Sequence, residues 1–174
     1  MTTRRPLDVS FRRGSEADSG VVLALFDEAI RWLVARGQTG QWGSAPASSR
    51  PALRERVARM SGGGGLHLAE RGSGSVGALV VGPAPSYVPA ADGDELYVEL
   101  LLTSRRYAGL GLGRQLLELA VDLARDERAE LLRVDCWAGA PRLIAWYEEQ
   151  GFARTTTFTL DGWRGQVFRK LVAA

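Results

Sequence analysis

The residue order that most constrains the fold is a strand-like run, then a glycine-rich turn, then an amphipathic helix, over residues 95–127. The run ELYVELLLT at 95–103 is long and mostly apolar, which is typical of a buried strand. Leucines and alanines recur at helical spacing over 112–127. Between these two segments, RYAGLGLGR at 106–114 holds three glycines that alternate with leucines. The sequence therefore predicts a strand that turns sharply into a helix.

The glycine turn is suited to binding phosphate. A loop that leads into a helix exposes unpaired backbone N–H groups at the positive end of the helix dipole. Glycine helps because a Cβ would hold the phosphate away from the amides. Charged contacts at the rim are expected from Arg105, Arg106 and Arg114. The alternative is a plain turn with glycines at its strained positions, but the long flanking elements favour phosphate binding.

Two nucleotide motifs fit the turn poorly. A P-loop is excluded because no Gly-Lys-Ser/Thr sequence follows the glycines. A dinucleotide fingerprint is partly matched by Gly109 and Gly111, and Asp135 stands where the ribose-binding acid would be expected. Its third glycine position, however, falls on Arg114. Too few residues remain after the turn for a doubly wound sheet, and the preceding segments do not alternate β and α.

The rest of the pattern predicts one α+β domain over residues 1–174, with 1–6 as a disordered tail. The expected helices, besides 112–127, are 15–36, 49–61 and 141–150. The expected strands, besides 95–103, are 7–11, 66–70, 76–81, 130–137, 154–160 and 165–171. Two loops, at 37–48 and 82–94, separate these elements.

Composition narrows the classes of function. The net charge is only +2, which argues against a nucleic-acid partner. No apolar run reaches the roughly 18 residues of a membrane helix, and no secretory signal is visible. The single cysteine, Cys136, and the single histidine, His67, exclude a Cys-rich or His-rich metal site. We therefore expect a cytoplasmic protein without a metal, a membrane or a nucleic acid among its partners.

The segment 95–152 resembles the GCN5-related N-acetyltransferases, or GNAT family. Their glycine motif is Arg/Gln-x-x-Gly-x-Gly/Ala at a strand-to-helix junction, and Gly111 and Gly113 match its two glycines. Ala108 departs from the family at the first position. A second frame, which begins at Arg106, fits the bare pattern but starts the helix two residues early, so we prefer the first.

The run APRLIAWYEEQGF at 140–152 resembles a second family landmark, Asn-x-x-Ala-x-x-x-Tyr-Glu-x-x-Gly-Phe. Tyr147, Glu148, Gly151 and Phe152 match it, whereas Ala140 stands where asparagine is common. The resemblance implies a single GNAT-like α+β domain with a mixed, mostly antiparallel central sheet and helices on both faces. It also implies that the strands at 95–103 and 130–137 splay apart.

The resemblance implies acetyl-CoA as the co-substrate. Its pyrophosphate would lie on the backbone amides of Ala108, Gly109, Leu110, Gly111, Leu112, Gly113 and Arg114. Its pantetheine arm would pair with the backbone of Leu101, Leu102 and Thr103, as an added strand pairs with a sheet edge. The N–H of Leu102 would then polarise the thioester carbonyl.

Acetyl transfer to an amine involves two proton movements. Tyr147 is the candidate general acid, and a tyrosine that only packs in the apolar stripe of its helix is the alternative. Glu99 is the candidate base, because a half-buried carboxylate binds protons more readily at neutral pH. An outward-facing Glu99, or a base formed by Glu95 and a water chain, stays open. A covalent route through Cys136 lacks a base partner in the sequence.

The acceptor is expected to be a primary amine of a small molecule or protein. It would bind between the loops at 37–48 and 83–94 and the C-terminal hairpin, where Trp42, Tyr87 and Trp163 are candidate walls. No motif in the sequence identifies the amine. A homodimer is an open alternative to a monomer. Two other functions stay open: a CoA-binding sensor without catalysis, and an NAD(P)-binding oxidoreductase.

Overall fold

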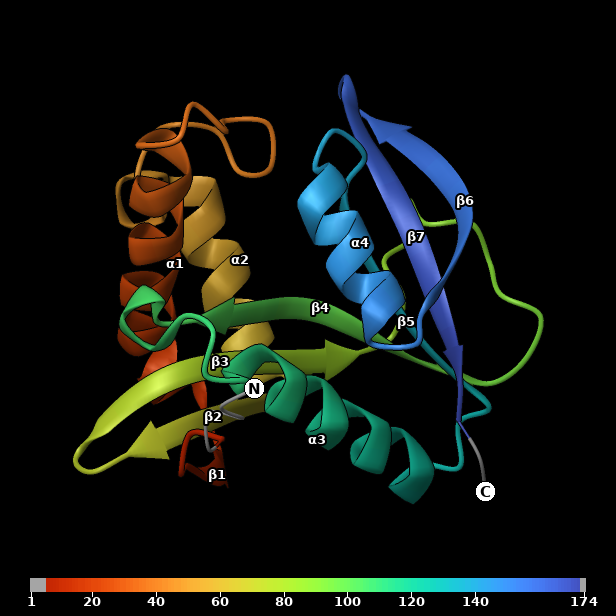
Figure 1. Cartoon of the computed structure of the whole chain (residues 1–174), viewed down its shortest axis with the longest axis horizontal. Helices are drawn as coiled ribbons and strands as arrows, with labels where there is room; N and C mark the ends of the chain where they lie inside the picture. The colour runs from red at the N-terminus through yellow and green to blue at the C-terminus, as the bar shows by residue number, and fades with distance from the viewer. Residues whose placement is uncertain (1–5, 173–174) are drawn as a thin grey trace, which may run out of the picture. The chain divides into compact units, whose positions relative to one another are not determined.

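A computed structural model gives the fold of residues 6–172 (Figure 1). The helices are α1 (Ser19–Val34), α2 (Pro51–Gly62), α3 (Leu112–Asp126) and α4 (Pro141–Glu149). Short 3₁₀ turns are η1 (Glu16–Asp18), η2 (Ala47–Ser49) and η3 (Arg105–Tyr107). The strands are β1 (Ser10–Arg13), β2 (Leu66–Arg71), β3 (Gly74–Gly82), β4 (Glu95–Thr103), β5 (Leu131–Trp137), β6 (Ala153–Leu160) and β7 (Trp163–Leu171). The tail expected at residues 1–6 lies, except for Pro6, outside the described residues.

The strands form a mixed sheet in the order β1-β2-β3-β4-β5-β7-β6. β4 and β5 run parallel, whereas the β1–β2, β2–β3, β5–β7 and β6–β7 pairs are antiparallel. The predicted α+β class with a mixed, mostly antiparallel sheet is therefore confirmed. The chain forms two compact units.

The first unit contains residues up to 39, 43–80 and 100–117. In it, α1 packs beside α2 (Figure 1) and buries Val22, Phe26 and Ile30. The helical spacing of these side chains is the reason that α1 was predictable. The glycine turn and the first residues of α3 also belong to this unit.

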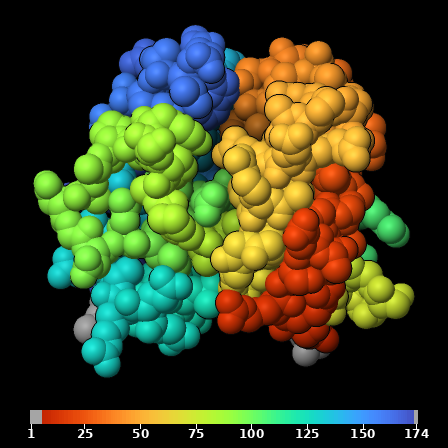
Figure 2. All heavy atoms as spheres, turned by 180° about the vertical axis from the view of Figure 1, so that it is seen from behind, coloured from red at the N-terminus to blue at the C-terminus, as the bar shows by residue number. Residues whose placement is uncertain are grey.

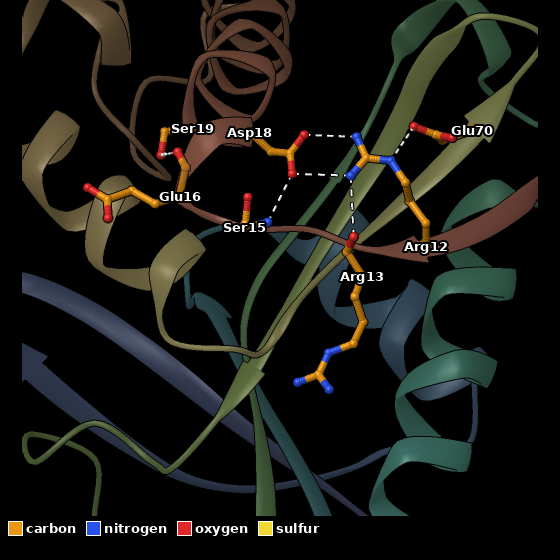
Figure 3. A network of polar contacts seen from close by, with 7 residues as sticks. All are labelled: Arg12, Arg13, Ser15, Glu16, Asp18, Ser19 and Glu70. Carbon is orange, nitrogen blue, oxygen red and sulfur yellow. Dashed lines mark hydrogen bonds and ion pairs between the residues drawn. The ribbon is translucent and has the colours of Figure 1, made fainter.

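A polar network joins β1, η1 and β2 at the surface of the first unit (Figure 3). Arg12 forms ion pairs with Asp18 at 2.8 Å and with Glu70 at 2.6 Å. The carboxylate of Asp18 also accepts from the backbone N–H of Ser15, which fixes the start of the helical segment. Figure 2 shows this β1–η1 segment next to α2, with which η1 is in contact.

The first strand lies later in the chain than predicted, at Ser10–Arg13 rather than 7–11. The backbone N–H of Leu7 donates instead to the carbonyl of Leu110 at 3.1 Å, and its side chain is buried. The apolar character of Leu7 therefore reflects packing beside the glycine turn. The exposed residues of β1 gave little strand signal of their own.

The second unit contains residues 40–42, 81–99 and 118 onward. β5 pairs with β7 along its whole length, and β7 pairs with β6. Tyr97, Phe158 and Val167 pack together in its core, and α4 contacts β6 (Figure 1).

The parallel pairing of β4 and β5 is short. It covers Glu95–Val98 on one strand and Leu131–Val134 on the other. Both strands continue beyond that point, β4 to Thr103 and β5 to Trp137. The strands predicted to separate, 95–103 and 130–137, are therefore the two that stop pairing partway.

Candidate functional site

The backbone of the glycine turn requires glycine at two positions. Gly109 has φ +76° and Gly111 has φ +77°, a region that residues with a Cβ rarely adopt. The N–H of Gln115 donates to the carbonyl of Gly111 at 3.0 Å, so α3 begins directly after this residue. A Cβ built on either glycine would meet nothing within 4 Å, so the space above the turn is open. Gly113 lies inside the first turn of α3.

The amides of the turn divide into two groups. Those of Ala108 and Leu110 donate within the chain, to the carbonyls of Arg105 and Tyr107, both at 3.2 Å. Those of Leu112 and Gly113 precede the first hydrogen bond of the α-helix, so the helix supplies no acceptor for them. The amides without an acceptor in the helix therefore lie at the start of α3, and the predicted cradle over 108–114 stays a prediction.

The turn is anchored from two sides by contacts that the sequence did not reveal. Leu7 binds it through the carbonyl of Leu110, and the side-chain amide of Gln115 donates to the carbonyl of Leu7 at 3.0 Å. On the other side, the carboxylate of Glu28 in α1 accepts from the N–H of Arg105 at 2.5 Å and from the hydroxyl of Ser104 at 3.1 Å. These anchors fix the path of the chain from β4 into the turn.

The β4 residues predicted to pair with pantetheine alternate in burial. Leu102 is buried, whereas Leu101 and Thr103 are half-buried. The carbonyl of Leu102 lies against Gly77 of β3, where a Cβ would be only 3.2 Å from the oxygen. The role predicted for the Leu102 N–H stays a prediction.

Glu99 is half-buried in β4, as the apolar run around it suggested. Its carboxylate lies directly over Gly82, where a Cβ would be 2.3 Å from the Glu99 Oε1 atom. Gly82 therefore makes room for this carboxylate, a relation that sequence spacing did not reveal.

Glu95 is engaged elsewhere. Its carboxylate forms an ion pair with the buried Arg133 at 2.9 Å, and Arg133 also donates to the carbonyl of Pro89 at 2.8 Å. This pairing ties β4, β5 and the loop at 82–94 together, so Glu95 has a structural role in the second unit.

Tyr147 is buried on α4, and its ring packs against Trp146, Phe152 and Phe168. Burial raises the pKa of its hydroxyl well above the usual range, and the nearby Cys136 and Asp135 add to the shift. Tyr147 is therefore a protonated phenol at neutral pH. α4 begins at Pro141, and its N-cap residue, Ala140, supplies no side-chain cap.

Cys136 and Asp135 lie near the end of β5. Burial raises the pKa of the Cys136 thiol to about 12, so the thiol is protonated at neutral pH and is a poor nucleophile. Asp135 accepts a 2.5 Å hydrogen bond from the hydroxyl of Tyr97. Asp135 thus binds a buried side chain of the protein, rather than standing free as a ribose-binding acid would.

Of the three segments predicted to surround the acceptor, the C-terminal hairpin, the loop at 83–94 and residues 40–42 of the first loop belong to the second unit. The indole N–H of Trp163 in the C-terminal hairpin donates to the carbonyl of Gly40 at 2.9 Å. Tyr87 and Trp163 both pack on Phe158, with ring centroids 5.3 and 5.8 Å apart. Trp42 is half-buried in the same unit.

Gln41 and Trp137 join this arrangement without having been predicted. The Oε1 atom of Gln41 accepts from the backbone N–H of Trp137 at 2.8 Å. The ring of Trp137 lies against Gly40 and Gly139, where a Cβ would come within 2.3 and 2.4 Å of it. The signal available in the sequence was a pair of glycines: Gly139, two residues after Trp137, and Gly40, in a distant segment.

Two further findings concern what residues 6–172 contain. No group of three or more His, Cys, Asp or Glu side chains in this range is arranged to hold a metal ion. No helix in this range is long and apolar enough to cross a membrane.

Comparison with known proteins gives a consistent result. The chain matches the model of the acetyltransferase (GNAT) family over residues 28–152. No curated protein matches it. An acetyltransferase of the GNAT family from Listeria monocytogenes is 22% identical with a TM-score of 0.70, over 95% of each chain.

Two other solved structures share the fold at 16% identity. The ribosomal-protein-S18-alanine N-acetyltransferase from Escherichia coli has a TM-score of 0.69 over 96% of each chain. A putative acetyltransferase from Salmonella typhimurium, solved with its cofactor acetyl-CoA, has a TM-score of 0.64 over 95% of this chain and 94% of that one. Because the family model spans most of the chain, from α1 through the glycine turn to the end of α4, the chain belongs to the GNAT family of acetyltransferases.

Proposed function

We propose that this GNAT protein is an acetyl-CoA-dependent N-acetyltransferase that transfers the acetyl group directly to a primary amine of a small molecule or protein. The observation that carries the proposal is the glycine turn, with two positive-φ glycines, open space above them and helix amides directly behind. Members of the family use acetyl-CoA, and the Salmonella structure holds it. The open space over Gly109 and Gly111 fits a pyrophosphate group.

In this proposal the backbone amides at the start of α3, with Gly109 and Gly111, hold the pyrophosphate. The positive end of the α3 dipole favours the negative charge there. The pantetheine arm pairs with the backbone of β4 at Leu101, Leu102 and Thr103, beyond the point where β4 stops pairing with β5. The family's Arg or Gln contact at position 108 is absent, because that residue is Ala108.

Tyr147 is the proposed general acid. Acetyl-CoA supplies a thioester. The carbonyl carbon of its acetyl group forms a bond to the amine nitrogen, and its bond to sulfur breaks. The phenol of Tyr147, which is protonated at neutral pH, gives its proton to the sulfur. The protonated thiol of Cys136 supports direct transfer rather than an acetyl-cysteine route.

Glu99 is the proposed base, which takes a proton from the amine. Gly82 supports this role, because the absence of a side chain there leaves room for the carboxylate at a half-buried position of β4. The other carboxylate of β4, Glu95, is paired to Arg133.

The first test separates ligand binding from turnover. Acetyl-CoA at millimolar concentration should raise the melting temperature by several degrees, whereas NAD and NADP should not. A panel of primary amines, followed by detection of the free thiol of CoA, should then identify accepted amines. No stabilisation by acetyl-CoA would contradict the proposal. Stabilisation without release of CoA for any amine would favour the CoA-binding sensor instead.

A further inference from the structure

The C-terminal half of α1 carries Trp32, and two arginines from outside this helix, Arg36 and Arg105, stack on its ring. The guanidinium carbon of Arg105 lies 3.9 Å from the centroid of the Trp32 ring, and that of Arg36 lies 4.1 Å from it. The two guanidinium carbons can therefore be no farther apart than the sum of these distances. Arg36 also donates to the carbonyl of Trp32 at 3.2 Å, which holds it in place.

No carboxylate within residues 6–172 forms an ion pair with either guanidinium group. Glu28 is the nearest acid on α1, but its Oε1 atom accepts from the backbone N–H of Arg105 and from Ser104. The Nε atom of Arg105 is buried without a hydrogen-bond partner. A buried donor of this kind costs free energy unless a ligand or ion satisfies it.

Electrostatics agrees with the geometry. Burial lowers the pKa of Arg105 and the positive charge of Arg36 lowers it further, whereas the negative charge of Glu28 partly offsets the shift. Two guanidinium groups on one ring, neither of them in an ion pair with residues 6–172, form a site that an incoming anion would neutralise. Guanidinium groups on the same ring, each with several N–H donors, suit the oxygens of one carboxylate or phosphate.

We propose that Arg36 and Arg105, held on Trp32, bind one carboxylate or phosphate group of the acceptor molecule. This proposal rests on the proposed acetyltransferase function. The acceptor is favoured as the source because Arg36 directly precedes the loop at 37–48, one of the segments predicted to bind the acceptor. The phosphates of the coenzyme have the amides of the glycine turn as their own partners. The preferred substrate is then an amine that also carries a negative charge.

The site can be tested without any acetyl transfer. In ¹H–¹⁵N spectra, the indole signal of Trp32, assigned with a Trp32→Phe variant, is followed during titration with inorganic phosphate and with acetate at constant ionic strength. We expect a saturable shift in the wild type and in Arg31→Met, an exposed arginine of the same helix. The shift should be lost in an Arg36→Met/Arg105→Met variant, whose side chains still cover the ring. No saturable shift in the wild type would overturn the site.

Kinetics then identify the source of the anion. Matched amines, such as 5-aminopentanoate and pentylamine, are compared at saturating acetyl-CoA, or equivalent pairs are drawn from the accepted amines. The double variant should raise KM for the carboxylate-bearing amine at least about tenfold more than it raises KM for the neutral amine.

A raised KM for acetyl-CoA, but not for acetyl-3′-dephospho-CoA, would assign the arginines to the coenzyme phosphate and overturn the acceptor assignment. Equal effects on both amines would overturn it as well. Failure of the proposed function is distinguishable, because it would appear as absent turnover in the wild type while the phosphate titration still reports on the arginines.

Discussion

The glycine turn of the first unit and the proton-transfer candidates of the second unit differ in the part of the chain that would act, which is backbone in one and side chains in the other. The turn consists of backbone: two positive φ angles and the N–H groups at the start of α3. The candidates Tyr147 and Glu99 are side chains whose chemistry depends on burial and on neighbours from distant segments. A backbone site is therefore encoded locally in the sequence, whereas a side-chain site is encoded by the tertiary structure.

The largest expected effect comes from Tyr147→Phe, which removes the proposed acid and keeps the ring contacts. Loss of a general acid should lower kcat by about 10²- to 10⁴-fold, with the Kd for acetyl-CoA unchanged. Steady-state kinetics and calorimetric titration measure the two quantities. Tyr87→Phe, a half-buried tyrosine packed on Phe158, is the matched control and should keep kcat. An unchanged kcat in Tyr147→Phe would leave Tyr147 as a packing residue.

A smaller loss of rate is expected from Gly82→Ala. The new Cβ would lie 2.3 Å from the Glu99 Oε1 atom, so the carboxylate must move. The φ of Gly82 is outside the positive region, so its backbone accepts alanine without strain. We expect kcat to fall about tenfold or more in Gly82→Ala. In Glu99→Gln, kcat should fall at least as far.

Gly74→Ala in the same strand is the control for Gly82→Ala, because a Cβ there meets nothing within 4 Å. It should leave kcat unchanged. If Glu99→Gln lowers kcat and Gly82→Ala does not, the exact place of the carboxylate is unimportant. If neither variant lowers kcat, Glu99 is not the base.

The backbone site is tested with Gly111→Ala. The added Cβ forces a strained positive φ and occupies the space above the amides, so the Kd for acetyl-CoA should rise about tenfold. The free energy of unfolding should fall by about 1 kcal/mol. Gly72→Ala, in the β2–β3 turn, shares the positive φ and the open surroundings. It should show the stability loss alone, and an equal rise in Kd in both variants would contradict a local role for the turn.

The sequence predicted the turn well, because glycine spacing, strand length and helix period are all local properties. It placed the first strand wrongly, because the burial of Leu7 comes from its contact with Leu110, more than a hundred residues later. The rim role expected for Arg105 stays a prediction, and the structure stacks its guanidinium on Trp32. Glu28, Gly82 and Gln41 were missed for the same reason, since each acts through a partner that only the fold brings near.

The smallest expected effect concerns His67, which titrates in the first unit and takes no part in the proposed chemistry. Burial lowers its pKa, so the folded protein holds the ring neutral more strongly than the unfolded chain does. The corresponding stability is present above the unfolded pKa of about 6.5 and is lost as the pH falls below it.

His67→Gln should therefore flatten the decline in the free energy of unfolding just below pH 6.5, as measured by denaturant titration at several pH values. The pH dependence of kcat should keep its position, because the proposed acid and base lie in the second unit. A shift in the pH dependence of kcat in His67→Gln would contradict the proposal that proton transfer depends on side chains of the second unit alone. It would then place a titrating side chain of the first unit within the catalytic cycle.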